Sequence, residues 1–353
     1  RLVDAEEIQP VAVLPPFVAV VPVLCRSLHI PEEQHQALFS CKPVFQGLAA
    51  GNVNFLFEHT AQKYEKSAID VAKDRSNISP VIVIFAENLK DMQNVLEKIE
   101  GAVREAAGLM VSGGFEIMQK DGVENLVTSS DLAVQHFLTG KLSEILPGSG
   151  FLCEEEDFRD LEEEYVWIVD PIDGTANYAR GIEDCCISVA LARGGELLAG
   201  VVYSPGRREM YTASKGNGAF LNGKRIHVSS RPFEAGLLCT AMSTYRKEFA
   251  GICSDIIYDI YMRSNDLRRF GSAAVELCMM AKGTIELYFE MRLQPWDYAA
   301  ASLILTEAGG CIADFDGNLP SLVRPSLVVA ANTRSSLDNI LDTVHRHLAS
   351  LPY

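Results

Sequence analysis

The chain of 353 residues is poor in basic side chains and lacks several patterns that define common protein classes. Lys and Arg number 31 against 47 Asp and Glu, so the formal net charge is −16. Because binding to nucleic acid needs clustered cations that neutralise phosphates, this balance argues against such a partner. No GxxxxGK[ST] string is present, which excludes a P-loop site. An acidic protein that binds an anionic ligand needs another source of positive charge, and a metal ion can supply it.

Long apolar runs and disulfide patterns are also missing. The longest uncharged apolar run, Val11 to Cys25, is too short to span a bilayer and is broken by Pro15, Pro16 and Pro22. No basic segment with a cleavage site precedes it, so no secretory signal is expected. The nine cysteines are odd in number and form no CxxC pair, which fits reduced thiols. We therefore expect a cytoplasmic protein that binds neither membrane nor nucleic acid.

The chain changes character near residue 90. Residues 1–90 are irregular, with a helix expected from Phe55 to Lys73 and a strand from Val81 to Phe85. From residue 91 onward the apolar residues recur with regular helix and strand periods. We expect an N-terminal extension of unknown fold, residues 1–90, followed by one domain, residues 91–353.

Helices and strands alternate in this second part. Apolar side chains at helical spacing predict a helix over residues 92–110 that ends near Gly113-Gly114, and another helix after Ser130. The apolar run Tyr165–Val169 predicts a buried strand. Further strands are expected over 187–192, 197–203, 209–213, 225–228 and 285–289, and further helices over 272–281 and 297–307. The pattern indicates a layered α/β arrangement.

The most informative segment is Trp167-Ile-Val-Asp-Pro-Ile-Asp-Gly-Thr-Ala-Asn-Tyr178. Its apolar strand brings Asp170 to the carboxyl end, where sites of α/β proteins form, and Asp173 follows on a turn. Two carboxylates so placed can converge, and Mg²⁺ between them turns their repulsion into coordination. Gly174 lets backbone N–H groups approach a phosphate closely. The same string is also typical of a plain type I turn in which Asp residues form caps.

Four stretches in this order resemble the inositol monophosphatase family. Asp170-Pro-Ile-Asp-Gly-Thr175 matches its first signature, and Gln294-Pro-Trp-Asp-Tyr-Ala-Ala-Ala-Ser-Leu-Ile-Leu-Thr-Glu-Ala-Gly-Gly310 is similar to its second. Leu126-Val-Thr-Ser-Ser-Asp131 and Phe151-Leu-Cys-Glu-Glu-Glu156 also fit. The resemblance runs from about Met92 to the C-terminus. It implies the five-layer α-β-α-β-α sugar-phosphatase fold and a homodimer.

The resemblance further implies two or three Mg²⁺ ions per site. Glu154, Asp170 and the backbone carbonyl of Ile172 would hold the first ion, and Asp170 would bridge to a second held by Asp173 and Asp297. Such ions bind the phosphate, lower the pKa of a bound water and stabilise the leaving alkoxide. Water attacks directly in this family, so no covalent phosphoenzyme is expected.

The catalytic residues implied by the resemblance are Asp131, Glu154 and Thr175. Thr175, with Asp131 behind it, would orient the attacking water and help accept its proton. Backbone N–H groups of Gly174 and Thr175 would bind phosphate oxygens. The alternative is that Asp131 simply caps the helix that follows it.

Two metal ligands and one lysine have alternative interpretations. Asp297 can be a plain helix cap. Glu154 lies in an acidic run that can be a solvated surface, and this chain has Cys153 where the family usually has Gly, so Glu155 can take its place. Lys120 matches a family lysine near the metals, but a lone lysine is also typical of the surface.

Substrate choice is expected to depend on residues beyond the phosphate. Glu290 precedes Asp297 by seven residues, the spacing at which the family places a carboxylate that binds substrate hydroxyls, and Ala273 belongs to the loop that touches the ring. Ala176-Asn177-Tyr178 differs from the Lys-Glu-Phe of nucleotide phosphatases in the superfamily. These residues favour myo-inositol 1-phosphate or a similar polyol phosphate.

The predicted function is therefore Mg²⁺-dependent, Li⁺-sensitive hydrolysis of a small phosphate monoester. Fructose-1,6-bisphosphatase activity or a broad-specificity sugar phosphatase remains an alternative, since the same metals serve both. A regulatory role through a protein partner is the alternative of a different class, as some bacterial relatives act on RNA-transcribing complexes.

Overall fold

The structure, a computed structural model, describes residues 80–111, 117–119, 126–155, 159–243 and 246–348. The helix expected from Phe55 to Lys73 lies outside this part. The chain divides into Arg1–Lys90 and Asp91–Tyr353. Helix α6, Pro80–Val111, begins in the first unit, so the strand expected over Val81–Phe85 is wrong. Pro80 suits the first turn of a helix, and a short apolar run cannot by itself distinguish a strand from a buried helix.

A large mixed sheet of eight strands forms one layer of the second unit, in the order β10-β9-β8-β7-β6-β5-β3-β4. Its strands are β3 Gly150–Cys153, β4 Arg159–Asp160, β5 Tyr165–Asp173, β6 Cys186–Arg193, β7 Glu196–Ser204, β8 Glu209–Ser214, β9 Ala219–Leu221 and β10 Lys224–Ile226. Only β3 and β5 pair in parallel, and the other neighbours are antiparallel. The expected meander after Asp170 corresponds to β6 through β10.

A second sheet of five strands has the order β12-β11-β13-β15-β14. Its strands are β11 Leu237–Thr240, β12 Asp266–Arg268, β13 Leu287–Leu293, β14 Cys311–Ala313 and β15 Ser326–Ala331. A small separate hairpin joins β1, Ile117–Gln119, to β2, Leu126–Thr128. The short helices are α8 Thr175–Tyr178, η3 Phe233–Ala235 and η4 Lys247–Phe249.

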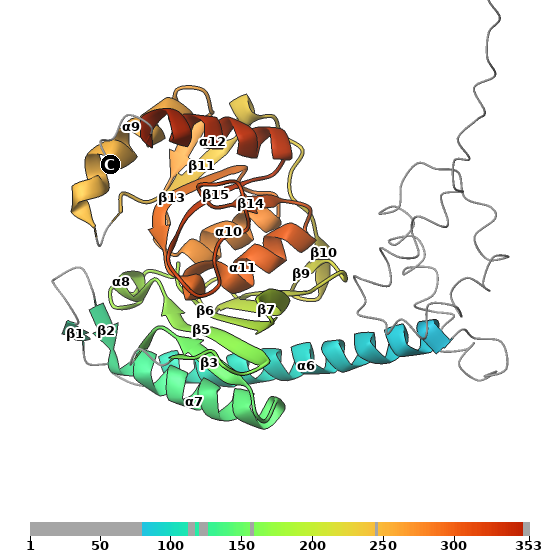
Figure 1. Cartoon of the computed structure of the whole chain (residues 1–353). Helices are drawn as coiled ribbons and strands as arrows, with labels where there is room; N and C mark the ends of the chain where they lie inside the picture. Colours follow the sequence, from blue (N-terminus) through green and yellow to red (C-terminus); the bar gives the residue numbers. More distant parts are fainter. Residues whose placement is uncertain (1–79, 112–116, 120–125, 156–158, 244–245, 349–353) are drawn as a thin grey trace, which may run out of the picture. The chain divides into compact units, whose positions relative to one another are not determined.

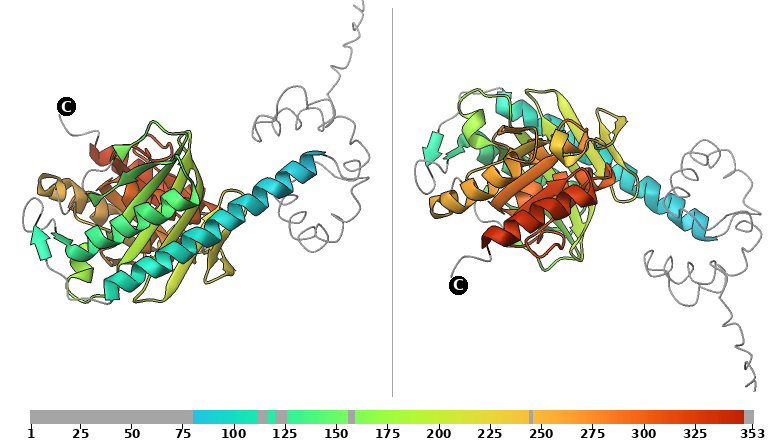
Figure 2. Two further views of the ribbon diagram at one scale, coloured as in Figure 1. Left: turned by 90° about the horizontal axis from the view of Figure 1, so that it is seen from below. Right: turned by 90° about the horizontal axis from the view of Figure 1, so that it is seen from above.

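Helices and sheets alternate in five layers, which confirms the predicted fold class (Figure 1). The helices are α7 Ser129–Ile145, α9 Ala250–Tyr261, α10 Ala273–Ala281, α11 Pro295–Glu307 and α12 Arg334–Leu348. Figure 2 shows α7 beside the part of α6 that packs on the large sheet, and α12 on the opposite outer face. Helices α10 and α11 fill the layer between the sheets, where almost all their side chains are buried.

Two further properties of the described residues are the state of the cysteines and the hydrophobicity of the helices. Six of the seven cysteines in the described ranges are buried, Cys311 is half-buried, and all seven are unpaired. None of the helices in the described part of the chain combines the length and hydrophobicity that a membrane span requires.

Close packing of α11 on the large sheet depends on Gly200 of β7. A Cβ at this position would lie 2.7 Å from the backbone oxygen of Ala300 and 3.2 Å from its Cα. Since both are backbone atoms, the helix itself would have to move. By contrast, a Cβ on Gly140, an exposed position inside α7, meets nothing within 4 Å.

We predict opposite effects of one methyl group at these two glycines. Gly200→Ala should lower the free energy of unfolding by about 1–3 kcal/mol through overpacking. Gly140→Ala should raise it by about 0.5–1 kcal/mol, because alanine loses less backbone entropy in a helix. Urea denaturation followed by circular dichroism measures both, and equal stability of the Gly200→Ala variant and the wild type would contradict the packing argument.

Candidate metal centre

A β-bulge places Asp170 and Asp173 on the same face of the large sheet. In β5, Asp170 lies opposite Ser188 and Asp173 lies opposite Cys186, so three steps on β5 face two steps on β6. Residues three apart on a regular strand point to opposite faces, but the extra residue restores the alternation. Pro171, which has no N–H to give to the ladder, occupies the bulge. The carboxylates therefore converge because of a local defect in the strand.

Asp297 reaches the same place from the start of α11. It is the third residue of the helix, and its Oδ2 accepts a hydrogen bond from the Gln294 N–H at 2.7 Å. One oxygen each from Asp170, Asp173 and Asp297 lie within 4.8 Å of one another. The cap interpretation of Asp297 and the ligand interpretation are compatible, since a carboxylate has two oxygens.

Strand alternation distinguishes Glu154 from Glu155. The Glu154 N–H donates to the Val169 oxygen at 3.2 Å and continues the pairing of β3 with β5. Cys153 packs in the core beside α7, whereas Leu152 packs in the core between the sheets. Glu154 therefore lies on the Leu152 face, the face that carries Asp170. Burial raises the pKa of Asp170 most, and the charge of Glu154 raises it further.

Glu155 follows Glu154 beyond the end of β3 and is held by its backbone. It is buried, and its backbone N–H and carbonyl exchange hydrogen bonds of 2.9 Å with the Gln135 side-chain amide of α7. These two hydrogen bonds fix the backbone immediately after Glu154. The geometry favours Glu154 as the carboxylate directed to the cluster.

Thr175 and Asp131 are in contact, as the resemblance implied. The Thr175 hydroxyl lies 3.1 Å from Asp131 Oδ1 and 3.0 Å from the Ile172 backbone oxygen. The other Asp131 oxygen accepts the Thr128 N–H at 2.8 Å and the Thr128 hydroxyl, which completes a capping box at the start of α7. Asp131 thus both caps the helix and contacts Thr175, and its burial raises its pKa.

The N-terminus of α10 holds Asp173 from the other side. Asp173 Oδ2 accepts hydrogen bonds from the Ser272 hydroxyl and the Ala274 N–H, both at 2.7 Å. Burial raises the pKa of Asp173 to about 6, although these donors lower it. Ala273 is the first residue of α10, so this element of the predicted substrate loop lies beside the cluster.

Mutual repulsion and burial make the cluster unfavourable without a cation. Burial is the largest effect that raises the pKa values of Asp170 and Asp297 well above normal, and neighbouring carboxylates raise both further. The donors are hard oxygens, the type that Mg²⁺ prefers. The residues present therefore fit a divalent-cation site.

Glu290 lies on β13 near this cluster. The Tyr288 hydroxyl donates to its Oε2 at 2.7 Å, and burial first, then the charge of Asp173, raise the pKa of Glu290 to about 7. Gly174, with φ of 87°, adopts the left-handed backbone conformation that favours glycine and precedes α8. Lys120 lies outside the described residues. The roles assigned to all these residues stay predictions.

Two hydrogen bonds of the Phe270 backbone near the cluster were not expected from the sequence. Asn177 donates from Nδ2 to the Phe270 oxygen at 2.6 Å, and Glu276 Oε1 accepts the Phe270 N–H at 2.6 Å. Glu276 carried one usable signal, because it is the single charge within the apolar helix α10. Asn177 carried none, since its partner lies 93 residues away in the sequence.

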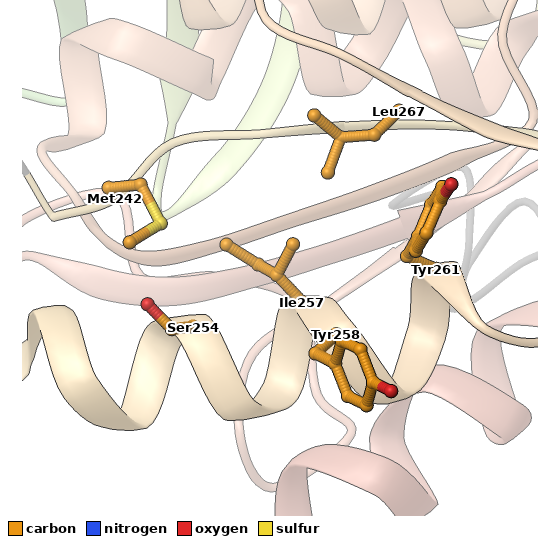
Figure 3. A pocket seen from close by; sticks show the side chains of 6 residues that line it. All are labelled: Met242, Ser254, Ile257, Tyr258, Tyr261 and Leu267. Atoms are coloured by element: carbon orange, nitrogen blue, oxygen red, sulfur yellow. The ribbon is translucent and has the colours of Figure 1, made fainter.

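A separate hollow lies away from the carboxylates, on helix α9 and strand β12. It has a volume of about 310 Å³ and an apolar lining of Met242, Ser254, Ile257, Tyr258, Tyr261 and Leu267 (Figure 3). None of the clustered acids lines it.

Two sheets separated by helices, with acids gathered at the end of β5 and the start of α11, define a layered α/β protein with a candidate divalent-metal centre. The chain belongs to the inositol monophosphatase family, whose profile matches residues 84–349. The Nus factor SuhB of Escherichia coli is 32% identical over 242 residues, which cover 66% of this chain and 90% of that protein. The inositol-1-monophosphatase of Mesorhizobium japonicum is 36% identical over 213 residues, 60% of this chain and 80% of that protein. The structure of the extragenic suppressor protein suhB from Bartonella henselae matches with a TM-score of 0.64 at 30% identity, covering 72% of this chain and 98% of that one.

We predict that stability responds to pH in opposite ways with and without Mg²⁺. The pKa of Asp173 is about 6 in the folded state and about 4 in the unfolded state. Between about pH 4 and about pH 6, the metal-free folded state therefore binds a proton that the unfolded state has lost. Stability contributed by this group is therefore lost as pH rises from about 4 to about 6. Mg²⁺ replaces the proton and should stabilise by about 2.7 kcal/mol at one hundred times its Kd.

Thermal melting across this pH range, with EDTA or with Mg²⁺, measures the effect. Asp173→Asn should melt higher than the wild type in EDTA at neutral pH, because it removes a buried charge, and should lose most of the Mg²⁺ response. Glu162→Gln, an exposed acid outside the cluster, serves as the control. A full Mg²⁺ response in Asp173→Asn would exclude Asp173 as a ligand.

Proposed function

We propose that this chain is a divalent-metal-dependent phosphatase that hydrolyses a small polyol or sugar phosphate monoester, with myo-inositol 1-phosphate as the favoured substrate. The observation that carries the proposal is the convergence of oxygens from Asp170, Asp173 and Asp297 within 4.8 Å. Membership of the inositol monophosphatase family and the similarity to an inositol-1-monophosphatase support the same reaction.

The residues have distinct parts in this proposal. Mg²⁺ would be held by Glu154, Asp170, Asp173, Asp297 and the Ile172 carbonyl. When bound, it supplies positive charge to the phosphate and lowers the pKa of water.

The remaining side chains and the turn act on the water and the ester. The Thr175 hydroxyl contacts Asp131 and so can orient a water and relay its proton. The turn at Gly174 presents backbone N–H groups to phosphate oxygens, and Glu290 and Ala273 contact the alcohol part of the ester.

The decisive test is phosphate release from myo-inositol 1-phosphate with and without Mg²⁺. Asp170→Asn should reduce kcat/KM by at least about a thousandfold, since a metal contributes several kcal/mol to such a step. Li⁺ should inhibit the wild type. No phosphate release from any polyol, sugar or nucleotide monophosphate would refute the proposal, and a higher kcat/KM on fructose 1,6-bisphosphate would favour that alternative.

A regulatory role is a second candidate because similar proteins from Escherichia coli and Neisseria meningitidis are named Nus factor SuhB and putative Nus factor SuhB. Such a role predicts a protein complex that forms equally well with the Asp170→Asn variant. The enzymatic role predicts that this variant cannot replace the wild-type protein in the cell. The homodimer and the cytoplasmic location also remain proposals.

We further propose that residues 91–353 carry the activity without residues 1–90. Met92, Leu96 and Ile99 of α6 pack in the core beside the large sheet, and the family profile reaches from residue 84 to residue 349. A chain beginning at Asp91 should retain kcat/KM within about twofold and melt cooperatively. Loss of activity with an intact melting transition would show that the N-terminal residues contribute to catalysis.

A further inference from the structure

The loop between β12 and α10 lies directly against the turn that carries Asp173. A Cβ placed on Gly174 would lie 3.2 Å from the Ser272 Cβ and 3.3 Å from the Gly271 backbone oxygen. Ser272 also donates to Asp173 at 2.7 Å. Whatever fixes this loop therefore fixes the surface next to the predicted phosphate-binding turn.

The peptide between Phe270 and Gly271 is held on both sides. Its oxygen accepts a hydrogen bond from Asn177 Nδ2 at 2.6 Å, and its N–H donates to Glu276 Oε1 at 3.0 Å. The preceding Phe270 N–H donates to the same Glu276 oxygen at 2.6 Å. Gly271 has φ of 86°, and a Cβ there would lie 3.2 Å from Asn177 Nδ2. The loop thus has one orientation, set by two side chains.

Each side chain suits this task by its chemistry. Glu276 is only 2% exposed and places one oxygen where two neighbouring N–H groups converge. Asn177 Nδ2 also donates to the Asp184 oxygen at 2.7 Å, so its two amide hydrogens join two separate backbone carbonyls. A carboxylate could not replace it, because both partners are acceptors.

Arg207 makes two further contacts with this group of residues. Asp184 is paired with Arg207 at 2.6 Å, and the Arg207 guanidinium stacks over the Phe270 ring at 5.5 Å. These contacts connect the loop after α8, the loop before α10 and the turn between β7 and β8.

We propose that Asn177 and Glu276 are positioning residues that hold the Phe270–Gly271 peptide beside the phosphate-binding turn and thereby determine which alcohol part of the ester fits. This inference rests on the proposed phosphatase function. The two side chains act through the loop, so they affect recognition of the alcohol more than the metal-assisted chemistry.

The test compares two esters that share the phosphoryl group. Myo-inositol 1-phosphate presents a polyol ring to the loop, whereas methyl phosphate presents none. Asn177→Leu and Glu276→Leu should each raise KM for the inositol ester about tenfold, the loss expected when a hydrogen bond worth about 1.4 kcal/mol is removed. For methyl phosphate, kcat/KM and the Mg²⁺ concentration for half activity should change less than about threefold.

Two controls keep the test specific. Glu276→Gln retains an oxygen that accepts both N–H groups and should keep the wild-type ratio of kcat/KM for the two esters. Glu286→Leu removes another buried carboxylate, which is 1% exposed. Glu286 accepts a hydrogen bond of 2.9 Å from the Leu237 N–H, whereas the Phe270–Gly271 peptide bonds to Asn177 and Glu276. It should lower the melting temperature and leave the ratio unchanged.

The inference is overturned if the leucine variants lose activity equally on both esters, if neither ester is affected, or if Glu276→Gln behaves like Glu276→Leu. Asn177→Leu, at a half-buried position, provides the measurement if Glu276→Leu does not fold. A wild type that hydrolyses methyl phosphate but not the inositol ester would also overturn it and leave phosphatase activity intact. Failure of the wild type on both esters would refute the proposed function and this inference with it.

Discussion

The repulsion among carboxylates gathered at one buried place is the constraint on which the site depends. Each of Asp170, Asp173 and Asp297 accepts a backbone hydrogen bond that favours its charged form, while burial opposes that form. Neighbouring acids oppose it further at Asp170 and Asp297. Backbone N–H groups carry only partial charges, so they cannot neutralise three acids. A divalent cation would neutralise them, and the site would then be more stable with the cation than without it.

The layered fold supplies these acids from different directions. The bulge in β5 turns two of them to the inner face of the large sheet, and α11 brings the third with its N-terminus. Helix α10 starts at the same place and grips Asp173. The middle layer can approach so closely because Gly200 leaves room for the backbone of α11. The missing side chain at Gly200 therefore lets α11 pack closely on the large sheet, and the start of this helix carries Asp297.

The sequence predicted the acids better than it predicted what holds them. The Asp-Pro-Ile-Asp-Gly-Thr string and the Trp-Asp pair are local patterns, so their places at a strand end and a helix start were readable. The choice between Glu154 and Glu155 follows from the alternation of Leu152 and Cys153 between two cores, which becomes visible only once the faces of β3 are known. The Asn177 contact joins segments 93 residues apart, and no local rule predicts it. The strand expected near Val81 failed because apolar content alone does not set the period.

The cost of the cluster bears on the choice between an enzyme and a binding partner. A protein that acts only through its surface gains nothing from buried acids that raise one another's pKa, and neutral residues of the same size would pack there with greater stability. Asp173 also accepts a hydrogen bond from Ser272 in the loop before α10, so the acid cluster and this loop are neighbours. Neighbouring sites of this kind suit a ligand in which a phosphate and the alcohol attached to it must be held together. The arrangement thus favours catalysis, and a regulatory role would make use of surfaces elsewhere on the same fold.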